Sequence, residues 1–337
     1  FMVPETYIKI LGIEKLGICE FFCLLLSIYD NYRCEHFPTV SSMLEQYYAE
    51  RNTVTRIRQK STDLRRIVQT ALERNIKKYD LQAKQLKDTE KREKYRIYGE
   101  LINTYGYDVP QGSKSFQALN YYTGEEITIP LDPQIPVQEN ATKYFDKYGK
   151  LKRTFEAVTA LLKETDEEIQ HLRSIQTALD IALQEEDLTQ IREELMESGY
   201  IRKRPSGSKR PKITSKPFHY ISSDGFHMYV GKNNLQNEEL TFHFANGGDW
   251  WFHAKKAPGS HVIVKTNGEE LPDRTFEEAA RLAAHYSKNS GAEKVEVDYV
   301  EKKQVKKPNG SKPGFVVYYT NYSMMIDSDI SGIQEVQ

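Results

Sequence analysis

Two long stretches of the chain repeat apolar residues every three or four positions, the spacing of one face of an α-helix. The first, residues 52–100, has no proline and no glycine before Gly99. In the second, residues 148–172, the apolar residues alternate more regularly between intervals of three and four positions, and the pattern continues less regularly to Leu183. A stripe of this kind keeps one side of a helix against a partner helix. The pattern predicts two long helices whose apolar stripes face each other.

The segment between these helices, about residues 105–140, is rich in proline and glycine and cannot be helical. The simplest arrangement is an antiparallel coiled-coil hairpin with this segment as its tip. Within the tip, Ala118–Pro130 predicts two short strands around a Thr-Gly-Glu turn. An isolated two-stranded hairpin is marginal in water, so it should dock on the helix ends or on a partner. Pairing of the stripes between two chains, giving a dimer, is the open alternative.

Residues 1–38 have a different pattern. Thr6–Leu11 and Phe21–Tyr29 predict strands, and the second is almost continuously apolar, as in a strand buried on both faces. Two strands cannot supply that burial, so we expect them to be the remnant of an amino-terminal domain. A helix should begin after Pro38, with a threonine or serine as its N-cap.

Beyond Lys216 the chain changes to short alternating stretches separated by turn residues, which is typical of strands. Residues 275–288 instead predict an amphipathic helix, with Thr275 as cap and Glu278 completing a capping box. We expect one antiparallel sheet with this helix packed on it. The predicted strands are Phe218–Ser222, Met228–Val230, Leu240–Phe244, Trp250–Ala254, His261–Lys265, Lys294–Val300 and Phe315–Thr320.

These elements together predict an α+β fold: a long antiparallel coiled-coil hairpin with a small β tip, followed by an antiparallel β-sheet domain with a packed helix. The expected parts are remnant strands at 1–38, a coiled-coil arm at 39–200, a basic linker at 201–217 and an α+β domain at 218–337.

The net charge of −1 conceals strong local asymmetry. Residues 201–216 contain seven basic residues and no acid, whereas residues 164–197 are rich in acid. A second basic segment follows at residues 301–313. Either segment alone could be a solvated loop. Two of them beside aromatic residues favour a polyanionic partner such as RNA.

Composition favours a cytoplasmic protein. The most apolar window, Cys19–Ile28, is much shorter than the roughly 20 residues of a membrane-spanning helix, so no membrane insertion is expected. The three cysteines form no CxxC pair, which is typical of a reducing compartment. The chain begins with phenylalanine and shows no signal-peptide pattern, so we expect it to be a fragment of a longer protein.

Trp250 and Trp251 are the only tryptophans. Adjacent residues of a strand point to opposite faces, so at least one indole should lie outside a one-sided core. An indole exposed beside lysines could stack on a base. The alternative is that both indoles are packed.

The sequence favours a binding protein over an enzyme. His253 and His261 have no third metal ligand at a suitable spacing, so we expect no metal and assign both to hydrogen bonding. There is neither a Gly-x-Ser-x-Gly elbow nor a P-loop, and no cofactor is expected. Lysines would pair with phosphate, asparagine amides would fix orientation and the indole would stack. The candidate RNA-binding residues are Lys232, Asn233, Asn234, Trp251, His253, Lys255, Lys256, Ser260, His261, Lys306, Lys307 and Lys312.

The last domain contains several short motifs, in this order: Gly231-Lys-Asn-Asn, Asn237-Glu-Glu-Leu-Thr, Asp249-Trp-Trp-Phe-His-Ala-Lys, Pro258-Gly-Ser-His, Val305-Lys-Lys-Pro and Lys312-Pro-Gly. In order and spacing, these motifs resemble the carboxy-terminal domain of the NFACT family. The resemblance also includes Tyr98-Gly-Glu-Leu-Ile, Asn120-Tyr-Tyr and the arm, so it covers nearly the whole chain from Phe37 onward.

The resemblance implies a non-catalytic factor that binds a large ribosomal subunit carrying an obstructed peptidyl-tRNA. It also implies recruitment of alanyl-tRNA and support for an alanine tail made by the ribosome's own peptidyl transfer. The family's amino-terminal domain and helix-hairpin-helix segment have no counterpart here, so this chain is expected not to support tailing by itself.

The same resemblance implies an alternative, because some family members are described as fibronectin-binding proteins. That function would place the chain outside the cell, as an anchorless surface adhesin. The sequence shows no anchor, secretion signal or disulfide pattern to favour it.

Overall fold

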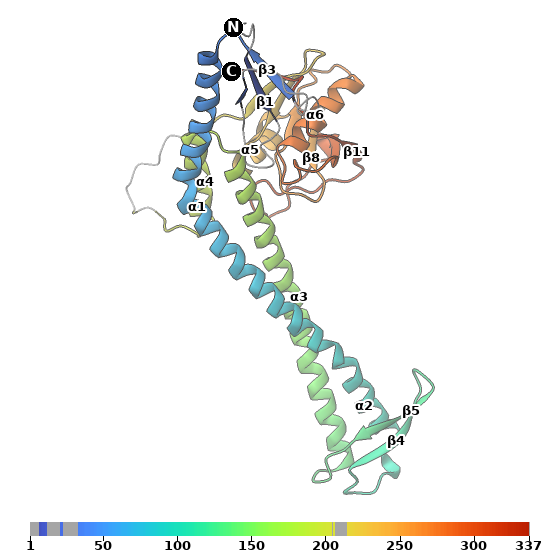
Figure 1. Ribbon diagram of the computed structural model, residues 1–337. Helices are drawn as coiled ribbons and strands as arrows, with labels where there is room; N and C mark the ends of the chain where they lie inside the picture. The colour runs from blue at the N-terminus through green and yellow to red at the C-terminus, as the bar shows by residue number, and fades with distance from the viewer. Residues whose placement is uncertain (1–6, 12–20, 23–32, 204, 206–213, 337) are drawn as a thin grey trace. The chain divides into compact units, whose positions relative to one another are not determined.

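The computed structural model describes residues 7–11, 21–22, 33–203, 205 and 214–336. It is an α+β protein with a long helical hairpin region followed by a seven-stranded antiparallel sheet, as predicted (Figure 1). The chain forms two compact units. We call Leu72–Gln170 the tip unit, and the remainder, residues up to Ala71 together with His171–Gln337, the base unit.

The tip unit contains the end of α1 (Val40–Asp88) and the beginning of α3 (Val137–Ile181). The first predicted helix is not continuous, because a 3-10 turn, η3, separates α1 from α2. The predicted hairpin is confirmed, although its first strand begins at Ser115 rather than Ala118. The remaining elements are η3 (Thr89–Lys91), α2 (Arg92–Tyr105), η4 (Gly106–Asp108), β4 (Ser115–Asn120) and β5 (Glu125–Pro130).

Apolar side chains fasten the hairpin to the helices. Leu101 and Ile102 of α2 and Ile129 of β5 are completely buried in one cluster. The Tyr144 hydroxyl of α3 donates a hydrogen bond to the Pro130 carbonyl over 2.6 Å. The prediction that the hairpin docks on the helix ends is therefore confirmed.

In the base unit, α1 starts where expected: the Thr39 hydroxyl accepts a hydrogen bond from the Ser42 N–H and caps the helix. Three strands precede it in the antiparallel order β2-β1-β3. The first two were predicted, the third was missed, and residues 23–29 of the second predicted strand lie outside the described residues. The strands are β1 (Tyr7–Leu11), β2 (Phe21–Phe22) and β3 (Arg33–Phe37).

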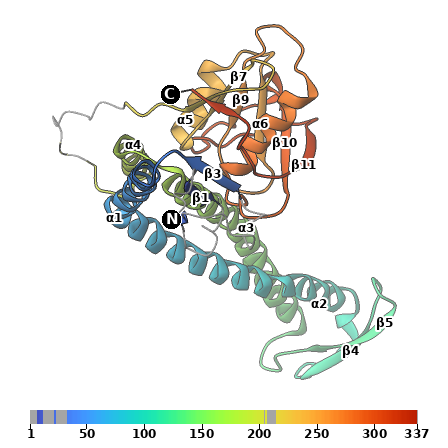
Figure 2. The same ribbon diagram turned by 45° about the horizontal axis from the view of Figure 1, so that its top comes forward.

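A separate helix, α4 (Glu185–Glu197), follows α3 and was not predicted. It lies beside α1 in both views (Figure 1, Figure 2), and Lys60 of α1 pairs with Glu185. Arg65 of α1 donates to the Leu179 carbonyl near the end of α3, where carbonyl groups lack helical partners. The predicted apolar stripes are buried at Ile57, Leu64 and Val68 of α1 and at Leu172, Ile175 and Leu179 of α3.

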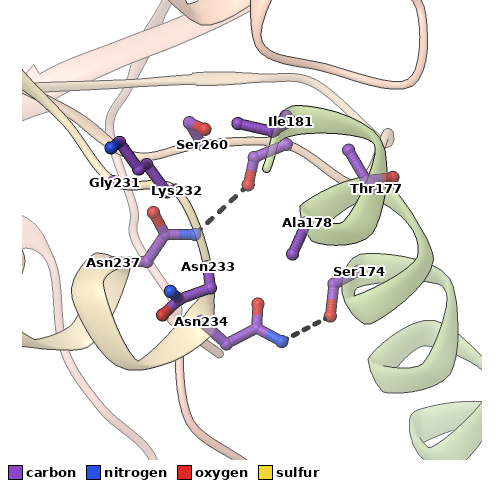
Figure 3. A pocket seen from close by; sticks show the side chains of 11 residues that line it. Ser174, Thr177, Ala178, Ile181, Gly231, Lys232, Asn233, Asn234, Asn237 and Ser260 are labelled. Carbon is purple, nitrogen blue, oxygen red and sulfur yellow. Dashed lines mark hydrogen bonds between the residues drawn. The ribbon is translucent and has the colours of Figure 1, made fainter. Parts of the chain in front are cut away.

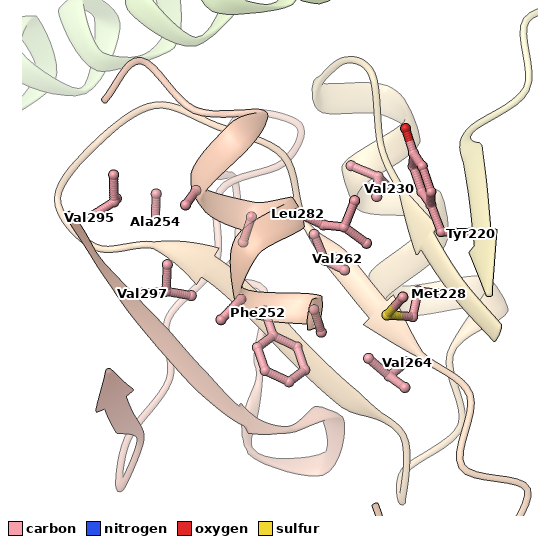
Figure 4. Close-up of a cluster of buried hydrophobic side chains, with 14 of the residues drawn as sticks. Tyr220, Met228, Val230, Phe252, Ala254, Val262, Val264, Leu282, Val295 and Val297 are labelled. Atoms are coloured by element: carbon pink, nitrogen blue, oxygen red, sulfur yellow. The ribbon is translucent and has the colours of Figure 1, made fainter. Parts of the chain in front are cut away.

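The last domain is built on an antiparallel sheet in the order β11-β10-β8-β9-β7-β6-β12. Helix α6 (Asp273–His285) packs on one face, over a cluster that includes Phe252 and Val264 (Figure 4). A second cluster, with Trp251 and Ile263, lies on the other face. The strands are β6 (Phe218–Ile221), β7 (His227–Val230), β8 (Trp250–Ala254), β9 (Val262–Val264), β10 (Val295–Glu301), β11 (Tyr322–Ile326) and β12 (Gln334–Glu335).

Two predicted strands are wrong. Residues 234–239 form α5, which continues as the π-helical turn η5 (Leu240–Phe244), because Asn233 caps a helix there. Residues 315–320 lie in a loop that touches the Lys306 backbone through one bridge at Val317. The strand that pairs with β10 is instead β11.

The predicted capping box of α6 is also wrong. The helix begins at Asp273, so Thr275 already lies inside it. The Thr275 hydroxyl donates to Asp224, and Glu278 accepts the Ser223 N–H at 2.8 Å. Both side chains fix the turn between β6 and β7 rather than the helix end.

Truncating Ile129 to alanine should destabilise the tip unit by about 2–5 kcal/mol, because the side chain is fully buried against α2. Denaturant unfolding monitored by hydrogen exchange should show the loss in residues 97–145. Leu119→Ala is the matched control, since that side chain is 50% exposed. Equal losses from both changes would contradict the docking.

Candidate nucleic-acid interface

The twelve predicted site residues do not form one exposed face. Six are buried, three are partly exposed and three are exposed. Half of the predicted residues are therefore not on the surface. The buried residues are Lys232, Asn233, Asn234, Trp251, Ser260 and His261; His253, Lys255 and Lys312 are partly exposed; Lys256, Lys306 and Lys307 are exposed.

The asparagines attach α5 to α3 and α4. The Asn233 side chain accepts the Gln236 N–H as the helix cap and donates to the Gln190 amide oxygen over 2.8 Å. The Asn234 amide donates to the Ser174 hydroxyl over 2.8 Å (Figure 3). It also donates to the Glu194 carboxylate over 2.7 Å. These amides hold the protein together instead of facing a ligand.

Lys232 has the same structural role. Its ammonium lies 3.5 Å from the Asp187 carboxylate and 4.4 Å from the centre of the Phe218 ring. Asp187 also accepts the Ser215 hydroxyl, over 2.6 Å. A buried cation between a carboxylate and an aromatic face is already paired, so Lys232 is not free to bind phosphate.

A third amide closes the turn that carries Ser260 and His261. Asn237 accepts the His261 N–H over 3.0 Å and donates to the Gly259 carbonyl over 3.2 Å. A Cβ atom on Gly231 would overlap the Asn237 side chain, which explains the glycine at this position. Gly231, Asn237, Gly259 and Ser260 line a small pocket together with the end of α3, and the Ser260 hydroxyl has no hydrogen-bond partner among the described residues.

Sequence reasoning missed the residues of α4 that accept hydrogen bonds from the asparagine amides and from Lys232. Asp187, Gln190 and Glu194 follow one another by three and four positions, so they lie on one side of the helix. Leu188, Ile191 and Leu195 form the adjacent apolar stripe. That periodicity was present in the sequence and could have separated α4 from the long helix before it.

The tryptophans point to opposite faces of β8, as predicted, but Trp251 is completely buried. It packs with Ile263 and Val300 under Tyr318, whose ring centre is 4.9 Å away. Trp250 is partly buried on the other face against Phe276. The prediction assumed a one-sided core, whereas both faces are covered here, so Trp251 is not available to stack on a base.

His253 and His261 belong to the same covered face. Their ring centres lie 5.6 and 5.1 Å from Trp251, and the His261 ring is 2.8 Å from the Thr241 hydroxyl. Burial lowers the pKa of His253 to about 4, and burial next to His253 lowers the pKa of His261 well below its ordinary value. Both rings are neutral at pH 7.

The remaining lysines lie at the two ends of β10. Lys255 follows β8 beside the start of β10, where it pairs with Glu296 over 2.7 Å, and Lys256 is its exposed neighbour. Lys306 and Lys307 lie beyond the other end of this seven-residue strand, which spans about 20 Å. The lysines therefore form two separate groups.

The second group lies on a segment with exposed aromatic rings. Residues 302–320 include Lys306 and Lys307, and Phe315 and Tyr319 are 44% and 68% exposed. Lys307 pairs with Glu238 of α5 over 2.7 Å, and Glu238 also accepts the Gly314 N–H, so the segment is attached to the domain. Sequence reasoning counted these aromatics as strand residues and missed them as candidates.

Two further observations concern the described residues only. No helix there is long and apolar enough to cross a membrane. Nor do three or more histidine, cysteine, aspartate or glutamate side chains gather there in an arrangement suited to a metal ion.

Changing Asn234 to alanine should cost about 1–3 kcal/mol of unfolding free energy, because two buried hydrogen bonds to Ser174 and Glu194 are lost. Chemical denaturation of the whole chain would measure it. Asn246→Ala, at an exposed position, should change stability by less than about 0.5 kcal/mol. A neutral Asn234 variant would show that the contact does not stabilise the protein.

The last domain should lose stability as the pH falls below about 6.5. The folded state binds fewer protons than the unfolded state between about pH 6.5 and 4, because folding lowers the pKa of His253 and His261. Each histidine should lower the free energy of unfolding by up to about 1.4 kcal/mol for each pH unit that the pH falls below about 6.5. Above that pH neither histidine should change the stability. Denaturation at pH 7.0 and 5.0 would test this, and His253→Gln should reduce the difference.

Two protein-family matches together cover almost the entire chain. Residues 5–214 match the family described as NFACT N-terminal and middle domains, and residues 216–319 match the NFACT protein RNA binding domain. The chain is 43% identical over 286 residues to the Rqc2 homolog RqcH of Streptococcus suis, and 36% identical over 314 residues to that of Bacillus subtilis. These matches cover 84% and 92% of this chain but 51% and 55% of the relatives, so the chain spans about half their length.

A solved structure agrees with these matches. The C-terminal of the fibronectin/fibrinogen-binding protein from Streptococcus suis superposes with a TM-score of 0.66 at 37% identity, covering 83% of this chain and 99% of that one. More distantly, 154 residues are 26% identical to the mouse ribosome quality control complex subunit NEMF. Sequence and fold agree on one assignment: the chain belongs to the NFACT family.

Proposed function

We propose that this chain is the part of a ribosome quality-control factor that binds RNA on a stalled large ribosomal subunit, and that it also contacts tRNA. Its last domain carries the RNA contacts. By analogy with the family, the whole factor supports addition of an alanine tail to the nascent chain while the ribosome performs the peptidyl transfer, and this chain contributes RNA contacts to it. The protein works in the cytoplasm in association with ribosomes.

One observation carries this proposal. Within the domain that matches an RNA-binding family, the segment 302–320 exposes lysines together with Phe315 and Tyr319. Ammonium groups neutralise phosphates and flat rings stack on unpaired bases, so one short segment offers both kinds of contact. Lys306, Lys307 and Lys312 stay in the proposed interface, and Lys256 is a separate cation at the other end of β10.

Among the twelve residues predicted from the sequence, the buried ones have a supporting role in this proposal. Lys232, Asn233 and Asn234 hold α5 against α4, and α5 in turn carries Glu238, which fixes the basic segment. The amides therefore position the phosphate-binding lysines without touching RNA themselves. The proposed interface contains no catalytic group, cofactor or metal ion.

A second candidate function comes from the solved relative. The structure described as a fibronectin/fibrinogen-binding protein matches 83% of this chain. Binding of fibronectin by an extracellular form of this chain is therefore the alternative. A fibronectin interaction that persists at 150 mM salt, in a chain that fails to bind RNA, would favour that alternative.

The double variant Lys306→Ala/Lys307→Ala should bind ribosomal RNA or tRNA more weakly, because it removes two phosphate contacts. The slope of log affinity against log salt should fall by about 2, and the melting temperature should change little, since both side chains are exposed. Filter binding between about 50 and 200 mM salt would measure the slope.

Glu238→Gln is the matched control for this test. It removes the carboxylate charge that holds Lys307 but retains both cations, so the slope of log affinity against log salt should stay that of the unmodified chain. Equal RNA affinity of the double variant and the unmodified chain would remove these lysines from the interface.

A further inference from the structure

A row of three rings lies on the face of the sheet opposite α6. His219 of β6 and Tyr229 of β7 face each other with ring centres 4.5 Å apart and planes within 5°. His227, two residues before Tyr229, lies against His219 at 5.0 Å and 27°. We call these three residues the ring row.

The ring row borders the part of this face that α5 and η5 cover. Tyr229 packs against the buried cluster around Trp251, and its ring meets that of Phe244 edge-on at 4.7 Å. His227 is exposed, His219 is partly exposed and Phe244 is 39% exposed. The rings are therefore in contact with solvent. The two histidines lie next to the buried cluster around Trp251 but are not part of it.

The packing of the core does not require the two histidine rings at this position, parallel to the Tyr229 ring. His219 and His227 belong to none of the buried apolar clusters, and the hydrogen bond between their ring nitrogens, at 2.7 Å, uses one nitrogen of each. Burial and the neighbouring His227 lower the pKa of His219, so the centre of the row is an uncharged ring at neutral pH. The exposed end of such a row, at His227, is a flat aromatic surface.

Two lysines lie near the row, and one of them is already paired with a carboxylate while the other is exposed. Lys265 lies opposite His227 in the register of β7 and β9, and its backbone N–H donates to the His227 carbonyl. Its ammonium lies 5.0 Å from the centre of the Phe244 ring and is held by Asp249. Lys216 is exposed just before β6.

The nearest carboxylates of the neighbouring elements are directed elsewhere. Glu335 of β12 is opposite Tyr220, which belongs to the α6 face of the sheet, and Asp224 is bonded to Thr275 of α6. Among the described residues, no ion pair or hydrogen bond joins a carboxylate to the rings of the row. Asp249 comes near the row only through Lys265, to which it is bound.

We infer that the ring row stacks an unpaired base of single-stranded RNA, with an adjoining phosphate near Lys216, the exposed cation before β6. This inference rests on the proposed function and adds to it a second contact, on the β6–β7 side of the domain rather than on the 302–320 segment. Bases in a duplex are already stacked on each other, so the row selects loops, bulges or single strands.

The test uses the whole chain and a single-stranded oligoribonucleotide of about twelve nucleotides that contains 2-aminopurine. The variant His219→Ala/His227→Ala should bind about tenfold more weakly, because one stacking contact is lost. The unmodified chain should quench 2-aminopurine fluorescence, and this variant should quench it less. The salt slope should stay the same, since no phosphate contact is removed.

Two control variants separate stacking from a structural effect. His219→Phe/His227→Phe retains flat rings and should bind within about threefold of the unmodified chain. His285→Ala removes an exposed histidine from α6, on the other side of the sheet, and should have no effect. Equal weakening by the alanine and phenylalanine pairs would overturn the stacking role.

The outcomes also separate this inference from the proposed function. If the histidine variant binds like the unmodified chain while the Lys306/Lys307 variant binds weakly, the ring row is not a contact and the proposed function stands. Equal affinity for a duplex of the same sequence would likewise overturn the inference. If the unmodified chain binds no RNA at low salt, both fail.

Discussion

Amide groups remain in a protein interior only when they find hydrogen-bond partners, and the position of the last domain on α3 and α4 depends on that constraint. Asn233, Asn234 and Gln236 each present an amide to the surface formed by Gln190, Glu194 and Ser174. Directional hydrogen bonds restrict how two surfaces meet more tightly than apolar contacts do. The network therefore fixes the orientation of α5, and with it the Glu238 carboxylate that holds Lys307.

The same constraint explains the appearance of the sequence in this region. A run of lysine and asparagines beside a glycine is what an anion-binding loop would present, since amides and ammonium groups are its natural donors. Here the acceptors are supplied by the protein itself, from residues about 40 positions earlier in the chain. Residue type identified the hydrogen-bonding chemistry correctly but not the partner.

Covering both faces of the sheet has a similar consequence for RNA recognition. Trp251, one of the two indoles of the domain, supports the core beneath Tyr318. Smaller rings that are accessible to solvent include Phe315 and Tyr319 on the basic segment and the ring row on β6 and β7. Proposed RNA contacts are thus distributed around a closed core.

The sequence alone determined the helical hairpin, its β tip, most strands of the last domain and the family, because these depend on periodicity and on motifs that are local in the chain. It also located the basic segment near Lys306, since charge needs no fold to be recognised. Only the tertiary structure decided that residues 240–244 are helical, that Thr275 lies inside its helix, and that Trp251 and the asparagines are buried. Burial and hydrogen-bond partners depend on which distant segment covers a residue, and α4 and the 302–320 segment provide that cover here.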